Sequence, residues 1–126
     1  SRFAQEGNAP FGQWTTKNHA GMVPKERKVG MTHKVRSFES LSKSVESYLR
    51  NLNTHRAYKS FRDLRAYFRR DKTPIDSHAI AGTLIKYSEK GKVYVDLLRH
   101  IIEKNDLRAL DGAQLGDAYL EFRPDA

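Results

Sequence analysis

Two aromatic rings flank a short polar link near the start of the chain, as Phe11-Gly12-Gln13-Trp14. Sugars present C–H faces that pack on aromatic rings, and a Trp N–H can also donate a hydrogen bond. The Gln13 amide can both donate and accept a hydrogen bond. One interpretation of this pattern is a surface that stacks on a sugar ring. The alternative, which the residue types alone favour, is that Phe11 and Trp14 fill the core.

Six of the seven glutamates, together with several aspartates, are candidates for acid–base chemistry. Glycosidic cleavage usually needs a carboxylic acid that protonates the leaving oxygen. It also needs a carboxylate, or the substrate's own acetamido group, to stabilise the positive centre or activate water. None of the six lies in a catalytic motif, and each is most simply a surface carboxylate. They are Glu6, Glu26, Glu39, Glu46, Glu89 and Glu103.

Other site chemistries find no pattern in this sequence. The five histidines lack a His-x-x-x-His pair, and there is no cysteine. We also find no Gly-rich phosphate loop and no nucleophile elbow. We therefore expect neither a metal nor a cofactor.

The composition indicates a globular domain with an anionic partner. The 126 residues are 38% hydrophobic and carry a net charge of +8. A positive field attracts nucleic acid, acidic membrane surfaces or anionic cell wall, and the alternative is a merely solvated basic surface. No apolar run reaches the ~20 residues that span a bilayer, so we expect no integral membrane segment.

The elements that must position these residues read as one small hairpin and four helices. Residues 1–20 read as the tail of a helix, a break and an irregular stretch. Alternation over residues 29–35 predicts a strand, with Met22-Val23 as its partner and residues 24–27 as the turn. We therefore predict an α+β fold weighted to α.

Four amphipathic segments predict the helices. The first helix begins at Ser40 or Ser42 and ends at Asn53-Thr54, and the second covers residues 57–70. The third has Pro74 in its first turn and carries Tyr87, and the fourth follows Gly91. Residues 106–126 are weakly patterned and form either a short helix around residues 114–120 or a loose tail. The expected inward faces are Leu41, Val45, Tyr48, Leu49 and Leu52; Ala57, Phe61, Leu64 and Phe68; Ile80, Thr83, Leu84 and Tyr87; and Tyr94, Leu97, Leu98, Ile101 and Ile102.

Three stretches, in order, resemble the bacterial Bax-type glucosaminidases of glycoside hydrolase family 73. Residues 6–14 carry Glu-Gly-Asn followed by Phe-Gly-Gln-Trp, and residues 38–65 match the branch-specific helix pair. Residues 80–95 resemble an element that brings a tyrosine to the active site. The resemblance implies a lysozyme-like domain over residues 1–105, lacking its first helix, and a C-terminal extension over residues 106–126.

The resemblance also implies a function. It is that of a peptidoglycan hydrolase, an endo-β-N-acetylglucosaminidase of the bacterial cell envelope that binds glycan strands and is expected to be a monomer. The family's general-acid glutamate lies upstream of the point that matches Ser1, so we expect this chain alone to be nearly inactive. No signal peptide is expected within this fragment.

Individual residues inherit roles from the resemblance. Trp14 is expected to line the groove, and the Tyr87 hydroxyl is expected to hold the N-acetyl group or the catalytic water. Tyr58 is expected to edge the groove, although a helix-end role is the alternative. Phe11 and Gln13 are expected to bind substrate beside Trp14, with the Gln13 amide on an N-acetyl group. Glu89 is also expected to bind substrate, although it belongs to a Ser-Glu-Lys that replaces the commoner Ala-Thr-Asp. Glu26 is the one carboxylate of the expected hairpin and therefore the candidate second carboxylate.

Two further functions remain open at this point. Without the upstream glutamate, the chain is alternatively a non-catalytic peptidoglycan-binding fragment. A basic helical module that binds nucleic acid is the other alternative, because Lys59, Arg62, Arg65 and Arg69 form a positive stripe that could follow phosphates. We expect no nucleic-acid partner, because no helix-turn-helix signature or aromatic platform accompanies that stripe.

Overall fold

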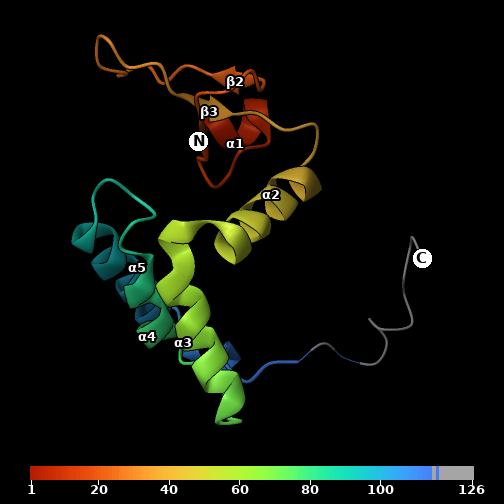
Figure 1. The fold of residues 1–126 in the computed structure, drawn as a ribbon, viewed down its shortest axis with the longest axis vertical. Coiled ribbons are helices and arrows are strands. Elements are labelled where there is room, and N and C mark those ends of the chain that lie inside the picture. Colours follow the sequence, from red (N-terminus) through yellow and green to blue (C-terminus); the bar gives the residue numbers. More distant parts are fainter. Residues whose placement is uncertain (115, 117–126) are drawn as a thin grey trace. The chain divides into compact units, whose positions relative to one another are not determined.

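A computed structural model describes residues 1–114 and residue 116 of the chain (Figure 1). The chain forms two compact units, of which the first is Ser1–His55 and the second begins at Arg56. The first holds a small antiparallel sheet and two helices, and the second is helical. The predicted mostly helical α+β class is therefore confirmed, whereas the boundary at residue 105 stays a prediction.

The first unit opens with helix α1 (Arg2–Gly7), which matches the predicted helix tail and break. The Ser1 side chain caps the helix by accepting from the Ala4 amide. Asn8 ends it in the left-handed conformation, at φ 50°. The Asn8 side chain then donates to the carbonyl oxygen of Phe38 at 3.0 Å, which ties the break to a distant segment of the unit.

Three short strands follow in the order β1-β3-β2, so β3 lies in the middle and is antiparallel to both neighbours. The strands are β1 (Trp14–Thr15), β2 (Gly21–Met22) and β3 (Lys34–Arg36). Val35, which is only 4% exposed, pairs with both Trp14 and Met22. A Cβ at Gly7 would lie 3.0 Å from the Met22 sulfur, so α1 packs closely against β2 because Gly7 has no side chain.

The expected hairpin is partly wrong. Pairing is limited to Lys34–Arg36 instead of extending back through residues 29–35, and residues 23–33 form a loop. The cause is local: Gly30 has a φ of 85°, and the Met31 amide donates to the Lys28 carbonyl in a turn. Strand β1, in the stretch expected to be irregular, supplies the third strand.

Helix α2 (Leu41–Thr54) confirms the predicted first amphipathic helix but turns a different face inward. Ser40 is the N-cap and accepts from the Lys43 amide at 3.2 Å. Ser44 is completely buried and Leu52 is 6% exposed. Three of the apolar side chains expected to be inward are exposed, namely Leu41, Val45 and Leu49. The inward face is therefore centred on the serines and Tyr48.

The described part of the second unit, residues 56–114 and 116, contains three helices and three 3₁₀ turns. They are η1 (Arg56–Tyr58), α3 (Lys59–Arg70), α4 (Ser77–Ala81), η2 (Gly82–Leu84), α5 (Lys92–Lys104) and η3 (Leu107–Leu110). The second and fourth predicted helices are confirmed. The third is shorter than expected, because Asp76 caps it after Pro74 and regular structure ends at Leu84. Tyr87 therefore lies in a turn beyond it.

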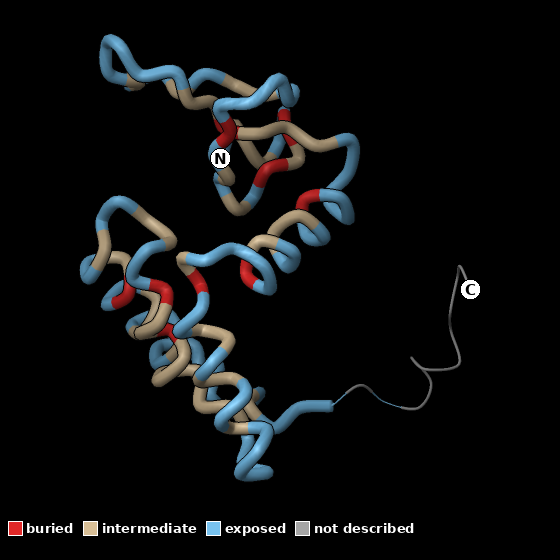
Figure 2. Tube along the Cα trace, viewed as in Figure 1, coloured by how far each residue is buried: buried red, intermediate tan, exposed pale blue. Residues whose placement is uncertain are grey.

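The core of the second unit lies where η1, α4, η2 and α5 meet (Figure 2). Its buried side chains are Tyr58, Ala81, Leu84 and Val95. On α5 the expected inward arc is corrected, since Leu97 and Ile101 are 54% and 42% exposed while Val95 is buried. No helix in the described part of the chain is long and apolar enough to cross a membrane.

Residues after α5 fold back onto the start of α4. Arg108 donates to the Asp76 carboxylate at 3.3 Å. The Asp111 carboxylate accepts from both the amide and the hydroxyl of Ser77, at 2.9 and 3.1 Å. The first part of the predicted C-terminal extension is therefore bound to the second unit. The helix expected around residues 114–120 lies mostly outside the described residues.

Candidate aromatic glycan-binding site

Trp14 is presented by the sheet of the first unit with one face covered. Its indole is 53% exposed and stacks on the His33 imidazole, with ring centroids 3.8 Å apart and planes 14° apart. Thr15, the next residue of β1, is only 8% exposed because successive side chains of a strand point to opposite faces. The strand thus buries Thr15 and leaves the outer indole face available for stacking.

The other aromatic of the motif, Phe11, packs inside the first unit. Its ring stacks on Tyr48 of α2, with centroids 4.3 Å apart and planes 17° apart. Burial raises the pKa of the Tyr48 phenol, because the charged form would lose its hydration. The two interpretations of the motif therefore apply to different residues: Phe11 lies against α2, and Trp14 is exposed.

Gln13 lies between these aromatics and binds α2 through both ends of its amide. Its Nε2 donates to the Ser44 carbonyl at 3.3 Å, and its Oε1 accepts from the Ser47 hydroxyl at 2.9 Å. A primary amide has two N–H groups and two lone pairs, so one donor and one acceptor position are left over. The predicted contact of Gln13 with an N-acetyl group stays a prediction and would use this remaining capacity.

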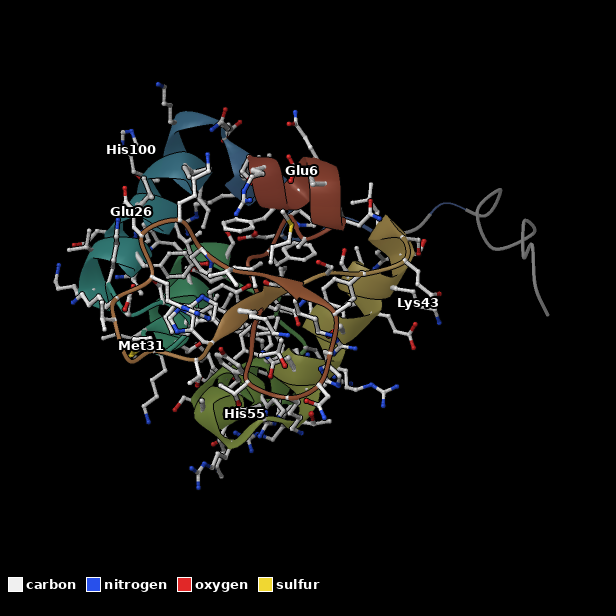
Figure 3. All side chains as sticks on the ribbon, turned by 90° about the horizontal axis from the view of Figure 1, so that it is seen from above. Glu6, Glu26, Met31, Lys43, His55 and His100 are labelled. Atoms are coloured by element: carbon white, nitrogen blue, oxygen red, sulfur yellow. The ribbon has the colours of Figure 1, made fainter. Side chains whose placement is uncertain are left out.

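Glu26 lies in a turn over residues 24–27, as predicted, but this turn is part of the long loop between β2 and β3 and does not join two paired strands. Its side chain is exposed (Figure 3), and the next residue, Arg27, donates from its amide to the Pro24 carbonyl at 3.2 Å. The Arg27 guanidinium also donates to the His33 carbonyl at 3.1 Å, which fastens the loop at its base. Nothing in this geometry orients the Glu26 carboxylate for catalysis, and its assignment stays a prediction.

The predicted tyrosines of the second unit come together. The Tyr58 ring lies 6.1 Å from Tyr87, and Tyr87 stacks on Tyr94 at 5.5 Å with planes 18° apart. Tyr58 is 6% exposed, whereas Tyr87 is half-buried. Glu89 is exposed in the following turn, which ends at Gly91 with φ 52°. This turn displays Glu89 and leads directly into α5.

The predicted site residues thus form two groups. Phe11, Gln13 and Trp14 lie together in the first unit, while Tyr58 and Tyr87 lie together in the second. Their convergence in one groove stays a prediction. Sequence reasoning missed three aromatic partners as site residues, namely His33, Tyr48 and Tyr94. Of these three, only His33 could have been identified from the sequence, because it lies two residues before Val35 in the predicted strand and was therefore expected on the same face.

The basic helix α3 uses several of its cations locally. Lys59 pairs with Asp63 at 2.6 Å, and the Arg65 guanidinium lies over the Phe61 ring at 5.3 Å. Arg70 similarly lies 5.6 Å from the centre of the Tyr67 ring. Two of the four cations of the predicted stripe, Lys59 and Arg65, thus have a local partner. The nucleic-acid alternative stays untested.

Two other kinds of site were sought in the described residues. No group of three or more His, Cys, Asp or Glu side chains there could hold a metal ion. An open hollow of about 310 Å³ lies between residues 72–74 and residues 111–114. It contains none of the predicted site residues, so the aromatic groups remain the candidate site.

Comparison with known proteins supports the family resemblance. The chain is 34% identical over 105 residues to Protein bax of Escherichia coli (strain K12). The match covers 83% of this chain and 36% of that protein, so the chain spans about a third of the curated relative's length. No protein-family model matches the chain, and no solved structure shows significant similarity to it. The similarity to Protein bax supports placing this chain in the Bax-type family.

Proposed function

We propose that this chain is the saccharide-recognising part of a peptidoglycan hydrolase of the bacterial cell envelope. The observation that carries the proposal is the Trp14 indole, which is 53% exposed and backed on one face by His33. A flat, half-covered ring of this kind suits the C–H face of a hexopyranose. The parent activity that we propose is that of an endo-β-N-acetylglucosaminidase.

The neighbouring groups suit an N-acetylated sugar. Gln13 lies one residue before Trp14, and its amide keeps one donor and one acceptor position beyond its bonds to α2. Either position can meet an acetamido group. In the second unit, Tyr87 is proposed to hold the N-acetyl group or a water molecule through its hydroxyl. The Tyr87 ring contacts both Tyr58 and Tyr94, which position it.

We propose that glycan binding, and not cleavage, is the activity of this stretch of chain. Glycoside hydrolysis needs a general acid, and such acids usually lie in surroundings that raise their pKa. The six glutamates among the described residues, Glu26 and Glu89 included, are all exposed. The family resemblance assigns the general acid to a position upstream of Ser1. Glu26 is kept only as the candidate second carboxylate.

The proposal is tested by calorimetric titration with soluble N-acetylglucosamine oligomers and glycan strands. Wild-type protein should bind the acetylated oligomers, and Trp14→Ala should weaken binding by about tenfold, as expected for loss of an aromatic stacking contact. Tyr67→Ala is the matched control, since Tyr67 is also an exposed aromatic, at 46%. Equal affinities for wild type and Trp14→Ala would contradict the proposal.

A turnover assay on purified peptidoglycan separates binding from cleavage. We expect release of reducing ends to stay close to the background rate. Rapid cleavage that is lost in Glu26→Gln would instead make Glu26 a catalytic group and overturn the assignment of this stretch to binding. Salt-sensitive DNA binding without glycan binding would favour the nucleic-acid alternative.

A further inference from the structure

We infer that His33 is a positioning residue for Trp14: its imidazole covers the inner face of the indole and holds the outer face ready for a sugar ring. This inference rests on the proposed function. The two centroids are 3.8 Å apart and the planes are 14° apart, so the rings share a face instead of meeting edge to edge.

The strand register brings the two rings together. Trp14 on β1 lies directly opposite Val35 on β3, so their side chains share one face of the sheet. His33 lies two residues before Val35, in the loop that leads directly into β3. The pairing of Trp14 with Val35 brings the indole within reach of the His33 ring, because residues diagonal to a cross-strand pair are close enough for aromatic side chains to touch.

The His33 backbone is fixed from two sides. Arg27 donates from its guanidinium to the His33 carbonyl at 3.1 Å. Lys34, the next residue, is paired with Thr15 in the sheet. These contacts hold the point from which the imidazole projects, so Trp14 packs on an immobilised partner.

The imidazole contributes its ring face and not a hydrogen bond through Nδ1. That nitrogen is buried and has no partner among the described residues. Buried polar atoms in folded proteins are nearly always hydrogen-bonded, so an unpaired one needs an explanation. We explain the unpaired nitrogen by the flat shape of the imidazole. The ring supports the indole at this position, and this contact compensates for the missing hydrogen bond.

An indole that is already ordered binds a sugar more tightly than one that must be ordered on binding. Immobilising a side chain costs conformational entropy, and preorganisation removes that cost from the binding step. With one face against His33, the exposed Trp14 ring keeps its orientation while its other face stays open. The inference therefore predicts that a flat ring at position 33 controls glycan affinity without touching the glycan.

The test compares His33→Ala and His33→Phe with wild type. The readouts are calorimetric affinity for N-acetylglucosamine oligomers and the emission anisotropy and iodide quenching of Trp14, the one tryptophan of the chain. His33→Ala should weaken binding by about threefold to tenfold, lower the anisotropy and increase quenching, because an aromatic contact is lost. His33→Phe should preserve all three, since it keeps the ring. His100→Ala, an exposed histidine of α5 (Figure 3), is the control and should match wild type.

Two results would overturn this inference but not the proposed function. The first is that His33→Ala leaves glycan affinity and Trp14 anisotropy unchanged. The second is that His33→Phe weakens binding as much as His33→Ala does, while far-UV circular dichroism shows that both variants are folded. Absence of oligomer binding by the wild type is a different result. It would overturn the proposed function and the sugar-facing role of Trp14 together. The anisotropy and quenching of the variants would then still report whether His33 orders the indole.

Discussion

The phenol ring of Tyr87 stacks on that of Tyr94, with centroids 5.5 Å apart, and so joins the turn after η2 to the first turn of α5. The turn has little regular structure of its own, which makes the ring contact a main support for Tyr87. Tyr94→Ala should lower the free energy of unfolding by about 2 kcal/mol, from half-burial plus the ring contact. Tyr94→Phe keeps the ring and should therefore lose less stability than Tyr94→Ala, as measured by denaturant unfolding. Equal losses in both variants would show that the hydroxyl, not the ring, provides the support.

Gln13 should matter for stability as well as for any ligand. Gln13→Ala removes two hydrogen bonds to α2 and should lower the free energy of unfolding by about 1–2 kcal/mol. Gln5→Ala is a matched control, because Gln5 is an exposed glutamine in the first unit. Chemical denaturation of both variants gives the comparison. A loss of glycan affinity in Gln13→Ala without loss of stability would mean that the amide serves the ligand and not the fold.

Burial of Tyr48 predicts a stability loss at alkaline pH. Its folded pKa lies above the ordinary value of 10.0, so the neutral phenol is favoured in the folded state. The contribution of Tyr48 to the free energy of unfolding is complete below about pH 10. It falls as the pH rises toward the folded pKa, because the unfolded chain releases the phenol proton first. Tyr48→Phe cannot lose a proton and should show a flatter decline in thermal stability above pH 10. Parallel declines in the two proteins would contradict the assignment.

Asp76 predicts a complementary effect at acid pH. Its bond from the Ala79 amide, aided by the charge of Arg108, lowers the pKa of the Asp76 carboxyl below the ordinary value of 3.8. The contribution to stability is therefore present above that value and disappears as pH falls through the folded pKa. At neutral pH, Asp76→Ala should cost about 1 kcal/mol as a lost N-cap. The difference in unfolding free energy between Asp76→Ala and wild type should become smaller at acid pH. Asp63→Ala, which changes an exposed residue in the middle of α3, is the control and should differ little from wild type at any pH.

The sequence predicted the elements whose signals are local. Ser40 caps α2, and Gly91 precedes α5, as their residue types indicate. The prediction that residues 29–35 form a strand was wrong over most of its length. Alternation indicates a strand only where a neighbouring strand is available for pairing, and Gly30 turns the chain away from such a neighbour. Strand β1 was not predicted because a strand of two residues is too short to show an alternation of polar and apolar side chains.

The face that a helix buries depends on partners far along the chain. The inward face of α2 is set by Phe11 and Gln13, which reach Tyr48, Ser44 and Ser47 from more than thirty residues away. Apolar periodicity alone could not predict that a serine face would be buried. The aromatic motif was singled out by its residue types, but its division into a packed Phe11 and an exposed Trp14 required the sheet.

The most direct test of the account is co-sedimentation of the chain with purified, protein-free peptidoglycan sacculi. We predict that wild type and the control Tyr67→Ala sediment with the sacculi, and that Trp14→Ala largely stays in solution. Because a stacking contact is weakly sensitive to salt, the difference should persist at an ionic strength of about 0.5 M, where exposed charges are screened. Sedimentation of Trp14→Ala equal to wild type, or binding that disappears for all three proteins in salt, would contradict glycan recognition through Trp14.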